Sequence, residues 1–156
     1  MTTWQEFAID SARTGAIATA ATAATAAACG GLESGQAAAP LNAISHIVWG
    51  KRAAQQNAPS WKYTFTGLAT HAAAVTSWAA IHEFFAHRAA ARGETSTVLL
   101  SAIGVSALAY LVDYRIVPDR FTPGFEKRLS QRSLLGVYSV LAGALAVGSL
   151  LRSARG

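Results

Sequence analysis

The chain has 156 residues, of which 52% are hydrophobic and 13% are charged, whereas an ordinary soluble domain has about 25% charged residues. Its net charge of +5 comes from Lys and Arg spread over the connecting segments and the C-terminal end. This distribution argues against nucleic acid as a partner and favours a lipid bilayer. The single cysteine, Cys29, excludes an internal disulfide and a multi-cysteine metal site.

The first expected element is a helix over about 8–29. From Gly15 onward it is nearly all Ala, with Thr at intervals of three and no charge after Arg13. Ala and Thr contribute little transfer free energy, but small side chains let helix backbones approach closely in lipid. We expect this helix to span the membrane, and the alternative of an Ala-rich helix lying along its surface stays open.

A short helix is expected over about 40–49, between Pro40 in a first-turn position and Gly50 just past its end. Its length of about 15 Å is half the thickness of a bilayer core. Polar residues, including Asn42 and His46, fall on one face. The segment is therefore predicted to be an amphipathic or re-entrant helix at the membrane interface.

Three further stretches predict spanning helices over about 63–86, 95–114 and 133–151. Each is long enough to cross a core of about 30 Å at 1.5 Å per residue, and 63–86 is the clearest of them. The turn at Gly93 is short, so the helices on either side of it should be antiparallel. The expected fold is an all-α membrane protein, a single domain over 1–156 with four transmembrane helices. The long connections carry more Lys and Arg than the other side, which places them in the cytoplasm.

Ionisable side chains at membrane depth are costly and are candidate functional groups. His71 lies early in the second span and Asp113 late in the third, so antiparallel helices bring both to the side of the long connections. A polar cluster is expected there, made of Glu33, Asn42, His46, His71, Tyr110 and Asp113. Such a set suits a divalent metal held by His46 and His71, a proton relay, or a lipid headgroup. Haem b on the same two histidines is a further alternative, and purely structural roles for these residues are another.

His71 lies nearest the bilayer centre, where a charged side chain costs at least about 2.5–3.5 kcal/mol. We therefore expect a neutral ring that faces the bundle interior and bonds to Ser106 or Tyr110 of the third span. At the other end of the same helix, Glu83 and His87 are four residues apart. They are expected to form an ion pair at the membrane edge.

Two parts of the chain resemble segments of short, uncharacterised bacterial inner-membrane proteins. They are residues 37–50 and the pair of segments 112–114 and 122–129. The resemblance implies a multi-pass protein of the bacterial inner membrane. It implies no activity, cofactor or functional residue.

No complete catalytic arrangement is recognisable, since a phosphate-binding glycine loop and a G-x-S-x-G motif are both missing from the sequence. The leading hypothesis is a non-enzymatic accessory or envelope-associated membrane protein without a cofactor. It would act through helix–helix contacts with another membrane protein or a second copy. The alternative is a small metal-, haem- or proton-handling membrane protein that uses the polar cluster.

Overall fold

The fold is entirely helical in the residues that the structure describes, which confirms the expected all-α class. The structure is a computed structural model that describes residues 4–153, with side chains as far as Leu151. Its α-helices are α1 (Trp4–Ser34), α2 (Ala39–Ile44), α3 (His46–Trp49), α4 (Thr66–Ala91), α5 (Thr95–Leu111) and α6 (Gln131–Ser153). Its shorter turns are η1 (Ala53–Gln55), η2 (Trp61–Phe65), η3 (Val112–Ile116) and η4 (Phe125–Lys127).

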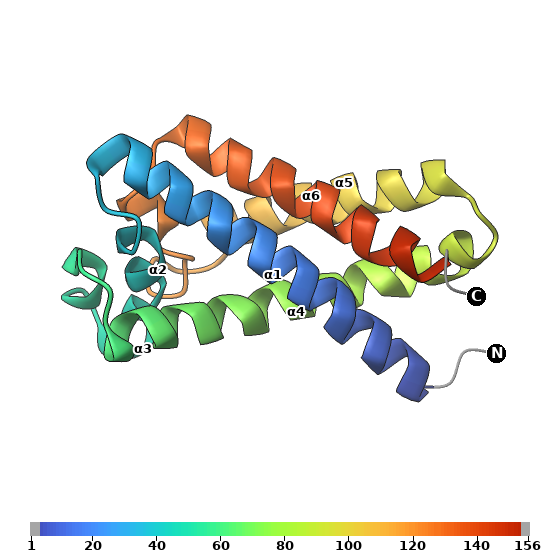
Figure 1. Ribbon diagram of the computed structural model, residues 1–156, viewed down its shortest axis with the longest axis horizontal. Coiled ribbons are helices and arrows are strands. Elements are labelled where there is room, and N and C mark those ends of the chain that lie inside the picture. The colour runs from blue at the N-terminus through green and yellow to red at the C-terminus, as the bar shows by residue number, and fades with distance from the viewer. Residues whose placement is uncertain (1–3, 154–156) are drawn as a thin grey trace.

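Four long helices, α1, α4, α5 and α6, form one elongated bundle (Figure 1). The start of α1, the end of α6 and the short turn between α4 and α5 lie at one end, which we call the turn end. The short helices α2 and α3 and the connection over 112–130 lie at the other, which we call the loop end. The antiparallel arrangement expected for α4 and α5 is therefore present.

Three helices are long and apolar enough to cross a membrane: Trp4–Ser34, Thr95–Ile116 and Gln131–Leu151. The helix expected to be the clearest span, α4, is not among them, so composition by itself supports three of the four expected spans. It carries His71, His82 and Glu83, and these residues lower its mean hydropathy. The Ala-rich first helix, expected to be the weakest, does qualify.

The short helix expected over 40–49 is in fact two helices, α2 and α3, which meet at Ser45. The Ser45 hydroxyl donates to the carbonyl of Asn42 at 2.7 Å, and the Ser45 amide reaches the same carbonyl. A side chain that bonds its own backbone three residues back competes with the helical pattern and breaks it. Gly50, with φ of 75°, ends α3, as expected.

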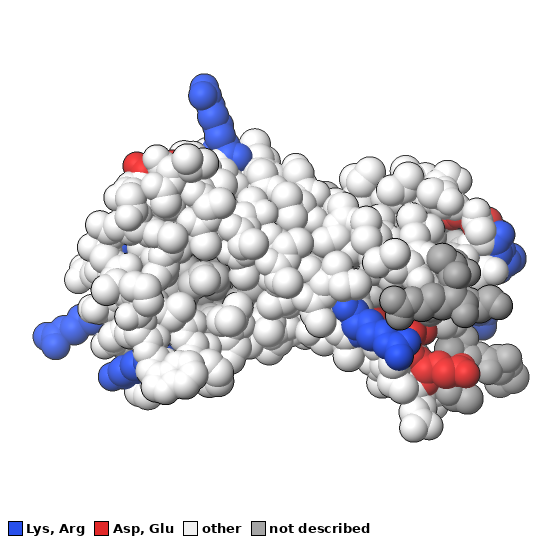
Figure 2. Space-filling view, viewed as in Figure 1, with Lys and Arg blue, Asp and Glu red and all other residues white. Residues whose placement is uncertain are grey.

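Small and polar residues fill much of the bundle interior, and many large apolar residues face outward. Glu83 is completely buried, whereas its neighbour Phe84 is 74% exposed. On α5, Leu100 and Ile103 face outward while Ala102 is buried. Figure 2 shows the charged side chains gathered toward the two ends, with an uncharged band between them. A molecule with this distribution is suited to a lipid solvent around its middle.

Close helix contacts on α1 depend on two glycines. A Cβ added to Gly15 would lie 2.9 Å from the Thr76 Cα of α4. A Cβ added to Gly148 of α6 would lie 2.9 Å from the Thr14 Cα of α1. Both distances are to backbone atoms, so a side chain at either position would push two helices apart. Small residues thus set the spacing of the first and last long helices, as the sequence indicated.

We expect Gly148→Ala to lower the free energy of unfolding by about 1–3 kcal/mol, because the new methyl group overpacks the α1–α6 contact. Gly143→Ala, on the same helix, is the matched control, since a Cβ there meets nothing within 4 Å. The measurement is thermal unfolding of both variants in the same detergent. Equal melting temperatures for the two variants would contradict the packing argument.

Candidate functional site

A polar network lies inside the bundle near the turn end and joins all four long helices. Glu83 of α4 accepts hydrogen bonds from Thr14 of α1 and Ser149 of α6, each at 2.7 Å. Its neighbour His82 contacts the hydroxyls of Ser149, at 3.0 Å, and Ser101 of α5, at 3.1 Å. His82 and Glu83 are both completely buried. Hydroxyl groups therefore replace water around two groups that lipid cannot solvate.

Glu83 and His87, expected as a pair at the membrane edge, each contact a residue of α1. Glu83 belongs to the buried network, one helical turn inside the bundle from His87. The His87 ring lies 3.5 Å from the Asp10 carboxylate of α1. The spacing of four residues places Glu83 and His87 on one face of α4. The sequence did not show that α1 supplies their partners, a hydroxyl for Glu83 and a carboxylate for His87.

His71 lies toward the loop end, where its Nε2 is 2.8 Å from the Thr22 hydroxyl of α1. That hydroxyl is also 2.7 Å from the carbonyl of Ala18, to which it donates. Since one hydroxyl has one proton, this geometry fits an Nε2–H that donates to Thr22. The expected partner on the third span was wrong, because Ser106 donates to the carbonyl of Tyr138 instead.

His71 and Asp113 line the same small cavity, of about 90 Å³, together with Thr22 and Tyr138. The Tyr138 hydroxyl of α6 donates to the Asp113 carboxylate at 2.5 Å. Tyr110 packs edge-on against Tyr138, with ring centroids 5.2 Å apart. Two of the six residues of the expected polar cluster thus line this cavity together with Thr22 and Tyr138, and a third, Tyr110, packs behind Tyr138.

The other three residues of that cluster hold the loop end together. Glu33 accepts from the backbone amide of Ser130 at 2.8 Å, just before α6. Asn42 donates to the carbonyls of Gln56 and Ala58 at 3.0 and 2.9 Å. The ring nitrogens of His46 lie 2.7 Å from the carbonyl of Ala43 and 3.3 Å from that of Asp119. Each of these contacts fixes an irregular segment.

An apolar layer separates the cavity from the network at the turn end. Along one face of α4, His71 is followed at intervals of four by Val75, Ala79 and Glu83, and both middle residues are buried. On α1, buried Ala18 lies between Thr14 and Thr22. His71 and Glu83 are twelve residues apart, about 18 Å along the helix. The layer separates the hydrogen bonds around His71 from those around Glu83.

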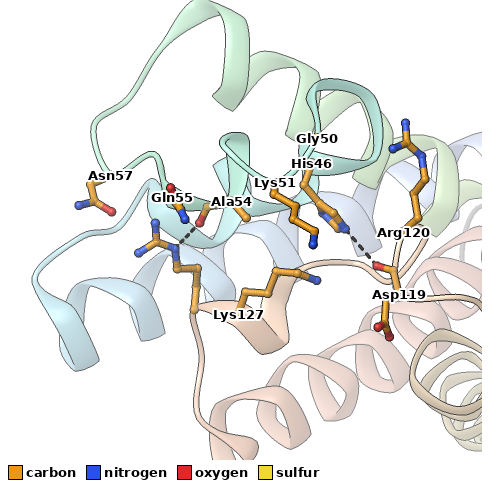
Figure 3. Close-up of a pocket in the computed structure, with 10 residues that line it drawn as sticks. His46, Gly50, Lys51, Ala54, Gln55, Asn57, Asp119, Arg120 and Lys127 are labelled. Atoms are coloured by element: carbon orange, nitrogen blue, oxygen red, sulfur yellow. Dashed lines mark hydrogen bonds between the residues drawn. The ribbon is translucent and has the colours of Figure 1, made fainter.

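A second cavity, of about 870 Å³, opens at the loop end (Figure 3). We call it the basic pocket, and its charged lining residues are Lys51, Asp119, Arg120, Lys127 and Arg128. His46, Gly50, Ala54, Gln55 and Asn57 complete the lining. The sequence showed these cations only as headgroup-facing loop charges, because the two connections that carry them are far apart in the chain.

The cations of the basic pocket are held by neighbouring groups. Arg128 donates through Nε to the carbonyl of Ala54 at 2.6 Å, and Lys127 lies 2.6 Å from the Glu126 carboxylate. Burial opposes ionisation of Glu126, but hydrogen bonds from Lys127 and Thr122 prevail and hold its pKa below the ordinary value. Glu126 is therefore a carboxylate near neutral pH.

Among the described residues, no group of three or more His, Cys, Asp or Glu side chains could hold a metal ion. The two nominated ligands, His46 and His71, bond to different neighbours. His46 contacts backbone carbonyls, and His71 contacts a threonine hydroxyl. The two histidines therefore make structural contacts at two separate places in the fold.

We expect Ser149→Ala to lower the free energy of unfolding by about 1–3 kcal/mol, because both His82 and Glu83 lose a buried partner. Ser77→Ala is the matched control, since Ser77 is exposed on α4 and bonds only to the carbonyl of Ala73. Its effect should stay within about 0.5 kcal/mol. The measurement is thermal unfolding in detergent, and a control that loses as much as Ser149→Ala would contradict the importance of the network.

Comparisons of the chain with protein-family models, with curated proteins and with solved structures found no match. The resemblance noted in the sequence therefore supplies an expectation of location alone, and the functional argument depends on the geometry described above.

Proposed function

We propose that the chain is a four-span integral membrane protein that acts by binding another transmembrane helix, without catalysis. Three of the spans are the helices that are apolar enough by composition. The fourth is α4, whose polar residues His71, His82 and Glu83 are all buried. Its outward surface carries Phe84 and Phe85, so lipid would meet an apolar face.

The observation that carries the binding proposal is a set of outward-facing glycines on α5 and α6. A Cβ added to Gly104, Gly136 or Gly143 meets nothing within 4 Å. Glycine in a helix costs about 1 kcal/mol relative to alanine, and no contact inside the bundle requires these three. Small residues on a lipid-facing surface let a second helix approach closely. A partner helix would therefore explain why glycine occupies these positions.

A groove of about 550 Å³ runs between α5 and α6, and each of these glycines directly follows one of its lining residues in the chain. Its lining includes Ala107 of α5 and Ser139 and Ala142 of α6, with Ile103 and Leu135 as larger neighbours. A groove with small residues among its lining suits a helix laid against it. The partner is a transmembrane helix of a second copy or of another membrane protein.

The location that fits this proposal is the bacterial inner membrane, with the loop end in the cytoplasm. The support for the orientation is the excess of Lys and Arg in the two long connections. Support for the type of membrane comes from the sequence resemblance alone.

Proton handling is a second candidate, favoured by one observation. His71 and Asp113 line a common cavity within the bundle, and such buried ionisable groups serve as proton relays in membrane proteins. Against this candidate stands the apolar layer of Ala18, Val75 and Ala79, which interrupts any path toward Glu83.

The binding proposal is tested by site-directed photocrosslinking in native membranes. In a Cys29→Ala background, Ser139→Cys and Ser77→Cys are labelled with the same photoreactive maleimide. Both serines are exposed and bond to a carbonyl four residues back, but only Ser139 lines the groove. We expect a discrete crosslinked band from Ser139→Cys alone, shifted by the mass of a second copy or of a partner. Equal crosslinking at both positions, or none at either, would contradict the proposal.

The second candidate is tested with purified protein in liposomes that contain a pH-sensitive dye. We expect no proton flux above that of empty liposomes, because the apolar layer lacks groups that carry protons. A flux that disappears in His71→Leu and persists in Trp78→Leu, a neighbour on the same cavity, would favour proton handling.

A further inference from the structure

We propose that the basic pocket binds the phosphate group of an anionic molecule, presented by a lipid headgroup or by a free phosphate ester. The site is independent of the helix-binding groove, which lies between α5 and α6. Its cations come from the two long connections, Lys51 from the first and Arg120, Lys127 and Arg128 from the second. Convergence of two connections on one cavity distinguishes the site from a general excess of charge in loops.

The pocket is built before any ligand arrives. Arg128 is fixed by the carbonyl of Ala54, and Arg120 lies 3.4 Å from the carbonyl of Ile47. His46 is buried, with its ring between two backbone carbonyls. Side chains that are already ordered lose little conformational entropy when an anion binds, which improves affinity.

The positive charge of the pocket is only partly neutralised. Four cations line it and Asp119 is its one lining carboxylate. In Figure 3 the Asp119 carboxylate points away from the amines of Lys51 and Lys127, which extend toward the same space. Lys127 is shared with Glu126, but Lys51 is exposed and extends into the opening. An anion carrying two negative charges would complete this arrangement.

Apolar residues beside the pocket place it at the level of lipid headgroups. Trp49 precedes Lys51 by two residues, and Phe121 follows Arg120 directly. Both aromatic side chains are exposed, as is Trp61 at the same end. Exposed aromatic residues mark the boundary between hydrocarbon and water, so the neighbouring cations lie where phosphate groups are concentrated. A volume of about 870 Å³ holds a complete headgroup and not merely a bare ion.

The test uses the full chain in nanodiscs of phosphatidylcholine, alone or with one-fifth phosphatidic acid or phosphatidylglycerol. Retained lipid is counted by native mass spectrometry. In parallel, inorganic phosphate and glycerol 3-phosphate are titrated against the phosphatidylcholine sample. Retention of anionic lipid identifies the lipid headgroup as the source, and saturable binding of the soluble esters identifies a free phosphate. Absence of both would overturn the proposal.

The matched variants are Lys51→Gln and Arg52→Gln, which remove one positive charge each at adjacent, exposed positions. Only Lys51 lines the pocket. Since a charge-assisted hydrogen bond is worth about a factor of ten in affinity, we expect Lys51→Gln to weaken binding about tenfold and Arg52→Gln less than twofold. Neither side chain holds the fold together, so both variants should retain the wild-type melting temperature. Equal weakening by both variants would show attraction to general surface charge and would overturn the site.

Discussion

The constraint on which the structure depends is that lipid offers no hydrogen bonds to a buried polar group. Helix α4 carries three histidines and a glutamate, and the buried ones, His71, His82 and Glu83, need partners inside the bundle. The hydroxyls of Thr14 and Ser149 meet Glu83, and that of Thr22 meets His71. These bonds fix the rotation of α4 about its axis, because any other rotation would turn those groups out of the bundle interior and away from their partners. The outward display of its phenylalanines follows from the same rotation.

Small residues make those hydrogen bonds reachable. A threonine hydroxyl extends only a short distance from its helix, so α1 must lie close to both α4 and α6. Glycines at 15 and 148 permit that approach, and an alanine-rich interior continues it along the helices. The poor apolar content of α1, which weakened the sequence argument for a span, is thus suited to its central position. Close packing contributes dispersion energy where the hydrophobic effect between helices is weak.

At the loop end, hydrogen bonds of polar side chains hold the irregular segments in place. Asn42 ties the 56–58 segment to α2, Glu33 ties the end of α1 to the start of α6, and His46 ties α3 to the 119 segment. With these segments fixed, the cations of the basic pocket converge on one opening. The residues proposed from the sequence as a functional cluster thus include three that position the pocket, and the charges lining it come from their neighbours.

The sequence by itself determined the helical class, the approximate limits of the long helices and their antiparallel order. The lengths of the uncharged runs and the turn at Gly93 are local properties, so they can be recognised in the sequence without knowledge of the fold. Counting residues along the antiparallel helices also placed His71 and Asp113 in the same half of the bundle. Only the tertiary structure decided the partners of polar side chains, such as Thr22 for His71 and Thr14 for Glu83. The physical reason is that α1 lies between α4 and α6, and a sequence pattern does not specify which helix becomes central. The basic pocket likewise required the loops to be placed in space, because its cations come from segments about 70 residues apart in the chain.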